Sequence, residues 1–196
     1  TSPEKRCGKT RTLSVIGRLC HKPLPASNIS PAAMFRVIEA QAPTLLVDEA
    51  DTFLRDHDEL RGIINSGFTR DTAFVIRTVG DEHEPRRFGT WAPKALALVG
   101  HAQDTITDRS IGVQLERKGP GEHIERLRQS DQFPEIKRMA VRWTADHTDG
   151  LRSAEPGLPP ELNDRAADLW EPLLVIADQI GGDWPDLARQ AAISLS

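Results

Sequence analysis

Hydrophobic positions near the start of the chain follow the period of a helix. In residues 10–20 they place Leu13, Ile16 and Cys20 on one face, a spacing that indicates an amphipathic helix. The proline-rich stretch 22–25 follows directly and predicts a turn that ends this helix. The chain therefore opens with a loop and a first helix.

Two further helices are predicted by the residues at their ends. Ser30 followed by Pro31 suits an N-cap and first helical position, which predicts a helix over 31–41. A second apolar pattern covers 58–66 and stops at Gly67. Both segments lie before the middle of the chain and alternate with strand-like runs.

Short apolar runs predict the strands, at 44–47, 73–79, 86–91, 94–99 and 111–115. The first is apolar throughout, which is typical of a strand buried on both faces. The polar turn 80–84 joins the next two as a hairpin. Alternating helices and strands predict an α/β fold with a mostly parallel sheet.

Beyond Gly119-Pro120-Gly121 the pattern changes to helices alone. These are predicted at 122–129, 134–147, 163–180, with an interruption at Pro172, and 184–194. We therefore expect two domains, an α/β core over 1–118 and a small helical part over 122–196.

Composition narrows the class of protein. The chain has 196 residues, 38% hydrophobic and 28% charged, with a net charge of −4, so a globular fold is expected and any binding of nucleic acid requires a local basic patch. Two cysteines without metal-ligand spacing suit a reducing, cytoplasmic setting. No apolar run reaches about 18 residues, so no membrane span is expected. The absence of an initiating Met suggests a piece of a longer protein.

The opening stretch TSPEKRCGKT ends in the three residues that hold phosphate in a P-loop, G-x-x-x-x-G-K-[ST]. Backbone N–H groups of the loop and the following helix N-terminus attract phosphate oxygens. Pro3 stands where the first glycine belongs and cannot adopt a positive φ. Three such residues also recur by chance, so the motif alone leaves the question open. The candidate nucleotide-binding residues are Glu4, Lys5, Arg6, Cys7, Gly8, Lys9 and Thr10, with Lys9 on the β- and γ-phosphates and Thr10 on Mg²⁺.

The run 44–47 ends in Asp48 and Glu49, which is the form of a Walker B element. Asp48 would hold Mg²⁺ through its water shell, and Glu49 would activate the attacking water. A strand that ends in a solvated acidic turn gives the same letters. The order of the two motifs along the chain favours a site for ATP and Mg²⁺.

Three polar residues outside these motifs are candidates for sensing or neutralising the γ-phosphate. His101, or Gln103, follows the strand 94–99 and would be a sensor, although a surface loop explains either residue as well. Arg109 lies where ring-forming ATPases supply an arginine to a neighbouring subunit, with a local pair to Asp108 or Asp104 as the alternative.

Arg165 is predicted in the first turn of a helix capped by Asn163 or Asp164. From there it would face the γ-phosphate, whereas the alternative is a solvated or acid-paired arginine. Four apolar residues of the same helix are expected to form the core of the helical part: Trp170, Leu173, Leu174 and Ile176.

The predicted hairpin is rich in basic and aromatic residues. Arg86 and Arg87 are candidate contacts to single-stranded nucleic acid, with Phe88 and Trp91 available to stack on bases. A solvated hairpin with two buried aromatic side chains fits the same letters.

Six stretches in order, SPEKxxGKT, LLVDEADTF, ELRGIINSG, FxTWAPKALA, DTITDRSI and DRAADLWEPL, resemble an uncharacterised family of bacterial and phage P-loop domains. That family often occurs with primase or helicase modules of phage and plasmid replication. It tends to carry Ser-Pro at the first loop glycine, so Pro3 looks like a family variant.

The resemblance implies an ATPase of the AAA+ and viral replicative helicase lineage. It assigns phosphate and Mg²⁺ binding to Lys9 and Thr10, the Walker B roles to Asp48 and Glu49, and a finger and a lid sensor to Arg109 and Arg165. It further implies an oligomer, or part of a larger replication protein, that remodels or translocates on DNA. A nucleotide-gated module with negligible turnover and an inert fragment are the alternatives.

The start of the chain departs from the family. The strand that precedes the loop is missing here, and in that fold this strand lies centrally in the sheet. We therefore expect the strand at 94–99 to keep an unpaired backbone edge.

Overall fold

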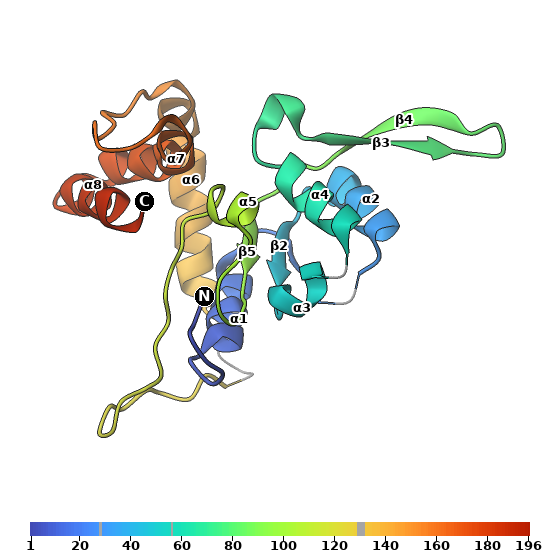
Figure 1. Ribbon diagram of the computed structural model, residues 1–196. Helices are drawn as coiled ribbons and strands as arrows, with labels where there is room; N and C mark the ends of the chain where they lie inside the picture. Colours follow the sequence, from blue (N-terminus) through green and yellow to red (C-terminus); the bar gives the residue numbers. More distant parts are fainter. Residues whose placement is uncertain (28, 56, 129–131) are drawn as a thin grey trace. The chain divides into compact units, whose positions relative to one another are not determined.

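The computed structural model describes residues 1–27, 29–55, 57–128 and 132–196. They form two compact units, one of residues 1–102 with 114–133 and one of residues 103–113 with 134–196. The first is mixed α/β and the second is helical (Figure 1). Residues 119–121, where the sequence places the domain boundary, lie inside the first unit, because the chain passes into the second unit at 103–113 and back again.

A parallel sheet is the centre of the first unit. Its strands, in spatial order, are β1 (Pro23–Pro25), β2 (Thr44–Val47) and β5 (Lys94–Leu96). β2 lies in the middle, and Leu45 and Val47 are fully buried, which confirms the strand predicted at 44–47. β5 is shorter than the predicted 94–99.

The predicted turn at 22–25 is wrong, because residues 23–25 pair with β2 as an edge strand. Proline is tolerated there since an edge strand leaves some of its N–H positions unpaired. Local sequence could not show this, because the pairing partner lies about 20 residues further along the chain.

The described part of this unit contains four α-helices, α1 (Lys9–Leu19), α2 (Pro31–Gln41), α3 (Ala50–Arg55) and α4 (Asp58–Ser66), and the 3-10 helix η1 (Arg70–Thr72). The predicted bounds of α2 and α4 are confirmed, and those of α1 shift by one residue. Leu13 of α1 packs on Leu46 and Ala97 of the sheet. The close approach requires Gly17, since a Cβ there would lie 2.8 Å from the Leu46 side chain.

The predicted hairpin is confirmed as β3 (Phe74–Val79) paired with β4 (Glu84–Gly89). It extends from its contacts with α2 and α4 (Figure 1). Phe88 is buried, and its ring lies 4.7 Å from that of Phe35 in α2. This tilted contact between the two rings fixes the base of the hairpin on the helical layer.

Two elements predicted after residue 110 are not formed. Residues 111–115 are not a strand, although the Leu115 N–H donates to the Thr1 carbonyl at 2.9 Å. A β-ladder needs hydrogen bonds at successive residues of two neighbouring segments, and residues 111–115 are not assigned to one. Residues 122–128 form no helix; Ile124 and Leu127 are the two apolar residues of this segment, and Ile124 is exposed. Residue 129 lies outside the described part.

The second unit consists of α5 (Asp104–Thr107), α6 (Pro134–Ser153), α7 (Asp164–Ile180) and α8 (Trp184–Leu195). α6 is longer than predicted, and α7 continues through Pro172. Trp170 and Leu174 pack with Ala192, as expected for the core. Leu173 and Ile176, predicted beside them, are instead 44% and 38% exposed. Among the described helices, none is long and apolar enough to cross a membrane.

Candidate functional site

The loop between Ser2 and α1 begins beside the chain segment that follows β5. Ser2 forms a parallel bridge with Val99, and the Gly100 N–H donates to the Ser2 carbonyl at 2.8 Å. Ser2 therefore takes the place of a fourth strand beyond β5, although it covers only the end of that edge. β5 is an edge strand of the three-stranded sheet, in agreement with the unpaired edge predicted for this strand.

The loop is closed by its own polar groups. The Glu4 carbonyl accepts hydrogen bonds from the Ser2 hydroxyl at 2.6 Å, the Lys9 ammonium at 3.3 Å and the Cys7 thiol at 3.4 Å. Lys9 Nζ also donates to Ser2 Oγ at 2.5 Å. Ser2 and Cys7 are buried, at 1% and 7% exposure. The loop thus holds the Lys9 ammonium at its centre.

The backbone of the loop turns sharply before α1. Arg6 and Gly8 have φ angles of 70° and 87°, in the left-handed region that favours glycine. Gly8 is the N-cap of α1 and supplies no side-chain cap to the first N–H groups of the helix. Such N–H groups are donors for an anion. Thr10 lies in this first turn and is exposed.

The end of β2 carries the two acids that the sequence singles out. Asp48 is half-buried, and its Oδ1 accepts a hydrogen bond from the Glu49 N–H at 3.0 Å. Glu49 is exposed and has a φ of 52°, an unusual conformation for a non-glycine residue. The next N–H, of Ala50, donates to the Ala97 carbonyl at 2.8 Å and ties this turn to the chain after β5.

A third acid, Asp51, was not found from the sequence. Its Oδ1 accepts a hydrogen bond from the Val99 N–H at 3.4 Å. It therefore braces the segment that bridges Ser2. The signal was present as a second aspartate three residues after Asp48, but the spacing alone does not say which strand it contacts.

The carboxyl ends of parallel strands meet at one edge of a sheet. Because β2, β5 and the bridge at Ser2 all run parallel, the loop 3–8, the acids after Val47 and the residues after Val99 all follow at the same edge. The structure thus brings Lys9, Asp48 and Glu49 to that edge. His101 also follows there and is exposed.

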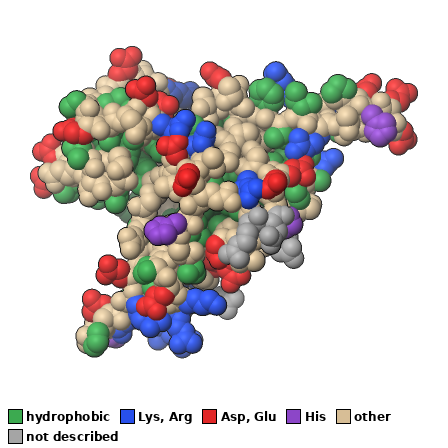
Figure 2. Space-filling view, viewed as in Figure 1, with side chains coloured by type: hydrophobic (Ala, Val, Ile, Leu, Met, Phe, Trp, Pro, Cys, Tyr) green, Lys and Arg blue, Asp and Glu red, His purple; other side chains and the backbone are tan. Residues whose placement is uncertain are grey.

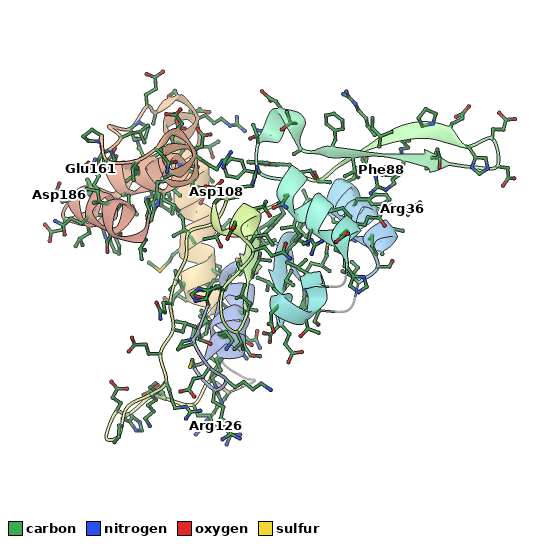
Figure 3. All side chains as sticks on the ribbon, in the orientation of Figure 1. Arg36, Phe88, Asp108, Arg126, Glu161 and Asp186 are labelled. Carbon is green, nitrogen blue, oxygen red and sulfur yellow. The ribbon has the colours of Figure 1, made fainter. Side chains whose placement is uncertain are left out.

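The two candidate arginines lie in the second unit. Arg109 Nη1 donates to the Thr105 carbonyl at 2.9 Å. Arg165, in the first turn of α7, forms an ion pair with Asp108, which follows α5 and is labelled in Figure 3. The acid-paired alternative for Arg165 therefore describes its contact in this structure, and the two arginines belong to one compact unit.

Strand register separates the two candidate arginines of the hairpin, Arg86 and Arg87. Arg86 lies on the face that packs on α2, with its guanidinium 4.8 Å from the Phe88 ring and 3.7 Å from Glu39. Arg87 lies on the opposite face, 4.0 Å from the Phe74 ring. Arg36 of α2 also covers Phe88 at 5.6 Å (Figure 3). Of the two predicted stacking aromatics, Phe88 is buried and Trp91 is 47% exposed.

Lys94 is half-buried, which sequence reasoning did not predict. It is the first residue of β5 and therefore lies at the opposite end of the strand from the loop 3–8. Its ammonium donates to the carbonyls of Ala92 at 2.9 Å and Gly67 at 3.2 Å. Burial lowers its pKa to about 8, because desolvation disfavours the charged form. It links the end of α4 to the sheet.

Metal ligands are sparse at the candidate site. In the part of the chain that the structure describes, no three His, Cys, Asp or Glu side chains gather as a preformed metal site. Magnesium in nucleotide enzymes characteristically takes one or two protein ligands and completes its shell with phosphates and water. Asp48 and Thr10 suit that mode of binding.

Comparison with known proteins locates similarity in part of the chain. Residues 114–196 match the family described as "Protein of unknown function (DUF3631)". A curated relative from Saccharopolyspora erythraea, "Uncharacterized 28.9 kDa protein in xis 5'region", is 42% identical over 84 residues. This match covers 41% of the chain and 31% of the relative, so the chain spans about a third of that protein's length. No solved structure matches.

Proposed function

We propose that this chain is the core of a P-loop ATPase that binds ATP with Mg²⁺ and hydrolyses it. The observation that supports the proposal is the parallel pairing of β2, β5 and Ser2, because it leads the loop 3–8 and the acids Asp48 and Glu49 out of the same end of the sheet. A phosphate-binding loop and a strand that ends in paired acids are the two halves of such a site.

The loop and α1 supply the phosphate-binding half. Arg6 and Gly8, which have left-handed backbone conformations, direct the loop toward the N-terminus of α1. This N-terminus has no side-chain cap, and its N–H groups attract the phosphates. Lys9 already lies inside the loop and exchanges its contacts with Ser2 and Glu4 for phosphate oxygens when ATP binds. Thr10, one residue on, contributes its hydroxyl to Mg²⁺.

The turn after β2 supplies the hydrolytic half. Asp48 is fixed by its hydrogen bond from the Glu49 N–H and holds the water shell of Mg²⁺. Glu49 is left exposed by its left-handed backbone and orients the attacking water as a general base. A Mg²⁺ ion held by Asp48 and Thr10 would supply positive charge to the transferred phosphoryl group.

Adenine is preferred over guanine on two grounds. The sequence contains no N-K-x-D guanine motif, and the lineage it resembles uses ATP. Hydrolysis powers remodelling or translocation on DNA in phage or plasmid replication. The chain acts there in an oligomer or as part of a larger protein. Arg109 then acts on a neighbouring subunit's nucleotide, so ATPase activity per chain rises with concentration.

ATP binding tests the proposal. Isothermal titration with Mg-ATP is compared for the wild type, Lys9→Ala and a matched control, Lys137→Ala, in α6 of the second unit. We expect Lys9→Ala to weaken binding by at least about tenfold, since it removes a charged hydrogen bond to phosphate, and the control to bind as the wild type. Equal affinity for all three proteins would overturn the nucleotide site.

A further inference from the structure

Basic side chains are concentrated in two segments of the first unit, 4–18 and 116–128. Together these segments contain nine Lys and Arg residues and four Glu residues. The local excess is five positive charges in a chain whose net charge is −4. The rest of the chain is therefore clearly acidic, and the two segments are the place where a polyanion is attracted.

Hydrogen bonds between the segments hold them together. Arg18 donates to the Arg128 carbonyl at 2.8 Å, and Arg11 to the Leu127 carbonyl at 3.4 Å. Arg117 donates to the Lys5 carbonyl at 3.3 Å and also pairs with Glu4 at 3.4 Å. Backbone carbonyls carry no net charge, so the three hydrogen bonds order the arginines without adding negative charge, and Glu4 is already counted in the local excess of five.

The resulting face is open to solvent. Apart from Arg117, which is exposed and pairs with Glu4, six of its basic side chains are exposed: Lys5, Arg6, Arg11, Lys118, Arg126 and Arg128. Arg126 and Arg128 line a shallow hollow with His123 and Glu125. Figure 2 shows Lys and Arg side chains gathered at the lower end of the view, where Figure 3 labels Arg126. We call these six residues the basic surface.

We infer that the basic surface binds the phosphate backbone of a nucleic acid. The inference deepens the proposed action on DNA and rests on it in naming the polyanion. Segments 4–18 and 116–128 contain no aromatic residue, so base stacking adds nothing and the contact is independent of sequence. Its strength comes from counterion release and falls with salt.

The hairpin is a weaker candidate for this contact. Residues 74–89 carry three arginines and three acids at pH 7, and its tip is acidic (Figure 2). Arg77 is paired with Glu59 at 2.7 Å, and Arg86 faces Glu39. The basic surface therefore supplies most of the affinity, in place of Arg86 and Arg87.

An anionic membrane is the less suitable partner. Surface binding to lipid characteristically uses an amphipathic helix that buries an apolar face. Residues 122–128 form no helix, and Glu122 and Glu125 interrupt the basic residues. A phosphate backbone, whose charges are discrete and spaced, tolerates such interruptions.

Fluorescence anisotropy without ATP tests the inference. Labelled single-stranded and duplex DNA of about 30 nucleotides are titrated with the full chain between 50 and 200 mM salt. The test variant is Lys118→Gln with Arg126→Gln, and the matched control is Arg138→Gln with Arg152→Gln in α6. Vesicles with phosphatidylserine form a separate arm.

We expect the test variant to weaken DNA binding about tenfold at low salt and to reduce the log–log salt slope by about 1.4 for single strands. The control should match the wild type. Equal affinities of test and control, no DNA binding by the wild type, or binding to vesicles alone would each overturn the inference. Because ATP is omitted, failure of the ATP site leaves this result interpretable on its own.

Discussion

The ammonium of Lys9 donates a hydrogen bond to the hydroxyl of Ser2 at 2.5 Å, across the base of the loop between them. The same hydroxyl donates to the Glu4 carbonyl at 2.6 Å. Ser2 thus connects the strand position beside Val99 with the side chain that the proposal assigns to phosphate. A loop without its first glycine is shaped in this chain by a buried serine.

Ser2→Ala is expected to destabilise the protein by about 1–3 kcal/mol, because it leaves the partners of a buried hydroxyl without their hydrogen bonds. Urea unfolding measures the change. The control is Ser14→Ala, since the Ser14 hydroxyl also donates to a carbonyl, that of Thr10, but at an exposed position. A loss no larger for Ser2→Ala than for Ser14→Ala would contradict the buried arrangement.

Stability is expected to rise with pH through the lowered pKa of Lys94. The pKa of this group is about 8 in the folded state, against an ordinary lysine value of 10.5 in the unfolded chain. Between these pH values the unfolded chain binds the additional proton, so raising the pH favours folding. The linkage contributes about 1–2 kcal/mol between pH 7.5 and 9.5, at about 1.4 kcal/mol per pKa unit.

Urea unfolding of the wild type and Lys94→Met at both pH values isolates this contribution. Other titrating groups are common to the two proteins and cancel in the difference. We expect the wild type to gain stability relative to Lys94→Met as the pH rises. A parallel pH dependence of the two proteins would show that the ammonium is not desolvated.

The cap of α7 is expected to matter for the helical unit. Asn163 Oδ1 accepts hydrogen bonds from the N–H groups of Arg165 at 3.1 Å and Ala166 at 3.0 Å. Asn163→Ala should cost about 1 kcal/mol of stability, whereas Asn163→Asp keeps an acceptor and should cost less. Thermal unfolding followed by circular dichroism compares them. Equal melting temperatures for the two variants would exclude the cap.

Local sequence patterns were sufficient to predict elements whose ends or burial depend on neighbouring residues in the chain. Ser30 caps α2 through a hydrogen bond from the Ala33 N–H at 3.3 Å, and the apolar run 44–47 is buried as predicted. β1 was missed because Pro23–Pro25 becomes a strand only by pairing with β2. The strand predicted at 111–115 is not formed, because a strand-like sequence pattern forms a ladder only where another segment pairs with it.

The candidate site likewise contains residues that sequence motifs predict and residues that only the folded structure reveals. Motif spacing was sufficient to select Lys9, Asp48 and Glu49, which the parallel strands bring to one edge. Ser2 and Asp51 escaped notice because their contacts depend on the pairing of Ser2 with Val99 and on the hydrogen bond from the Val99 N–H, which no local pattern encodes. The ion pair of Arg165 with Asp108 likewise joins residues far apart in sequence.

Hydrolysis of ATP by the acids after β2 is the central claim, and phosphate release tests it most directly. The wild type, Glu49→Gln and the nearby control Glu39→Gln, in α2, are assayed with Mg-ATP, with and without single-stranded DNA, after binding is measured for each. We predict phosphate release by the wild type and the control, and ATP binding with release reduced by at least about 100-fold in Glu49→Gln. Binding of ATP by the wild type with no phosphate released would contradict the claim and leave a nucleotide-gated module.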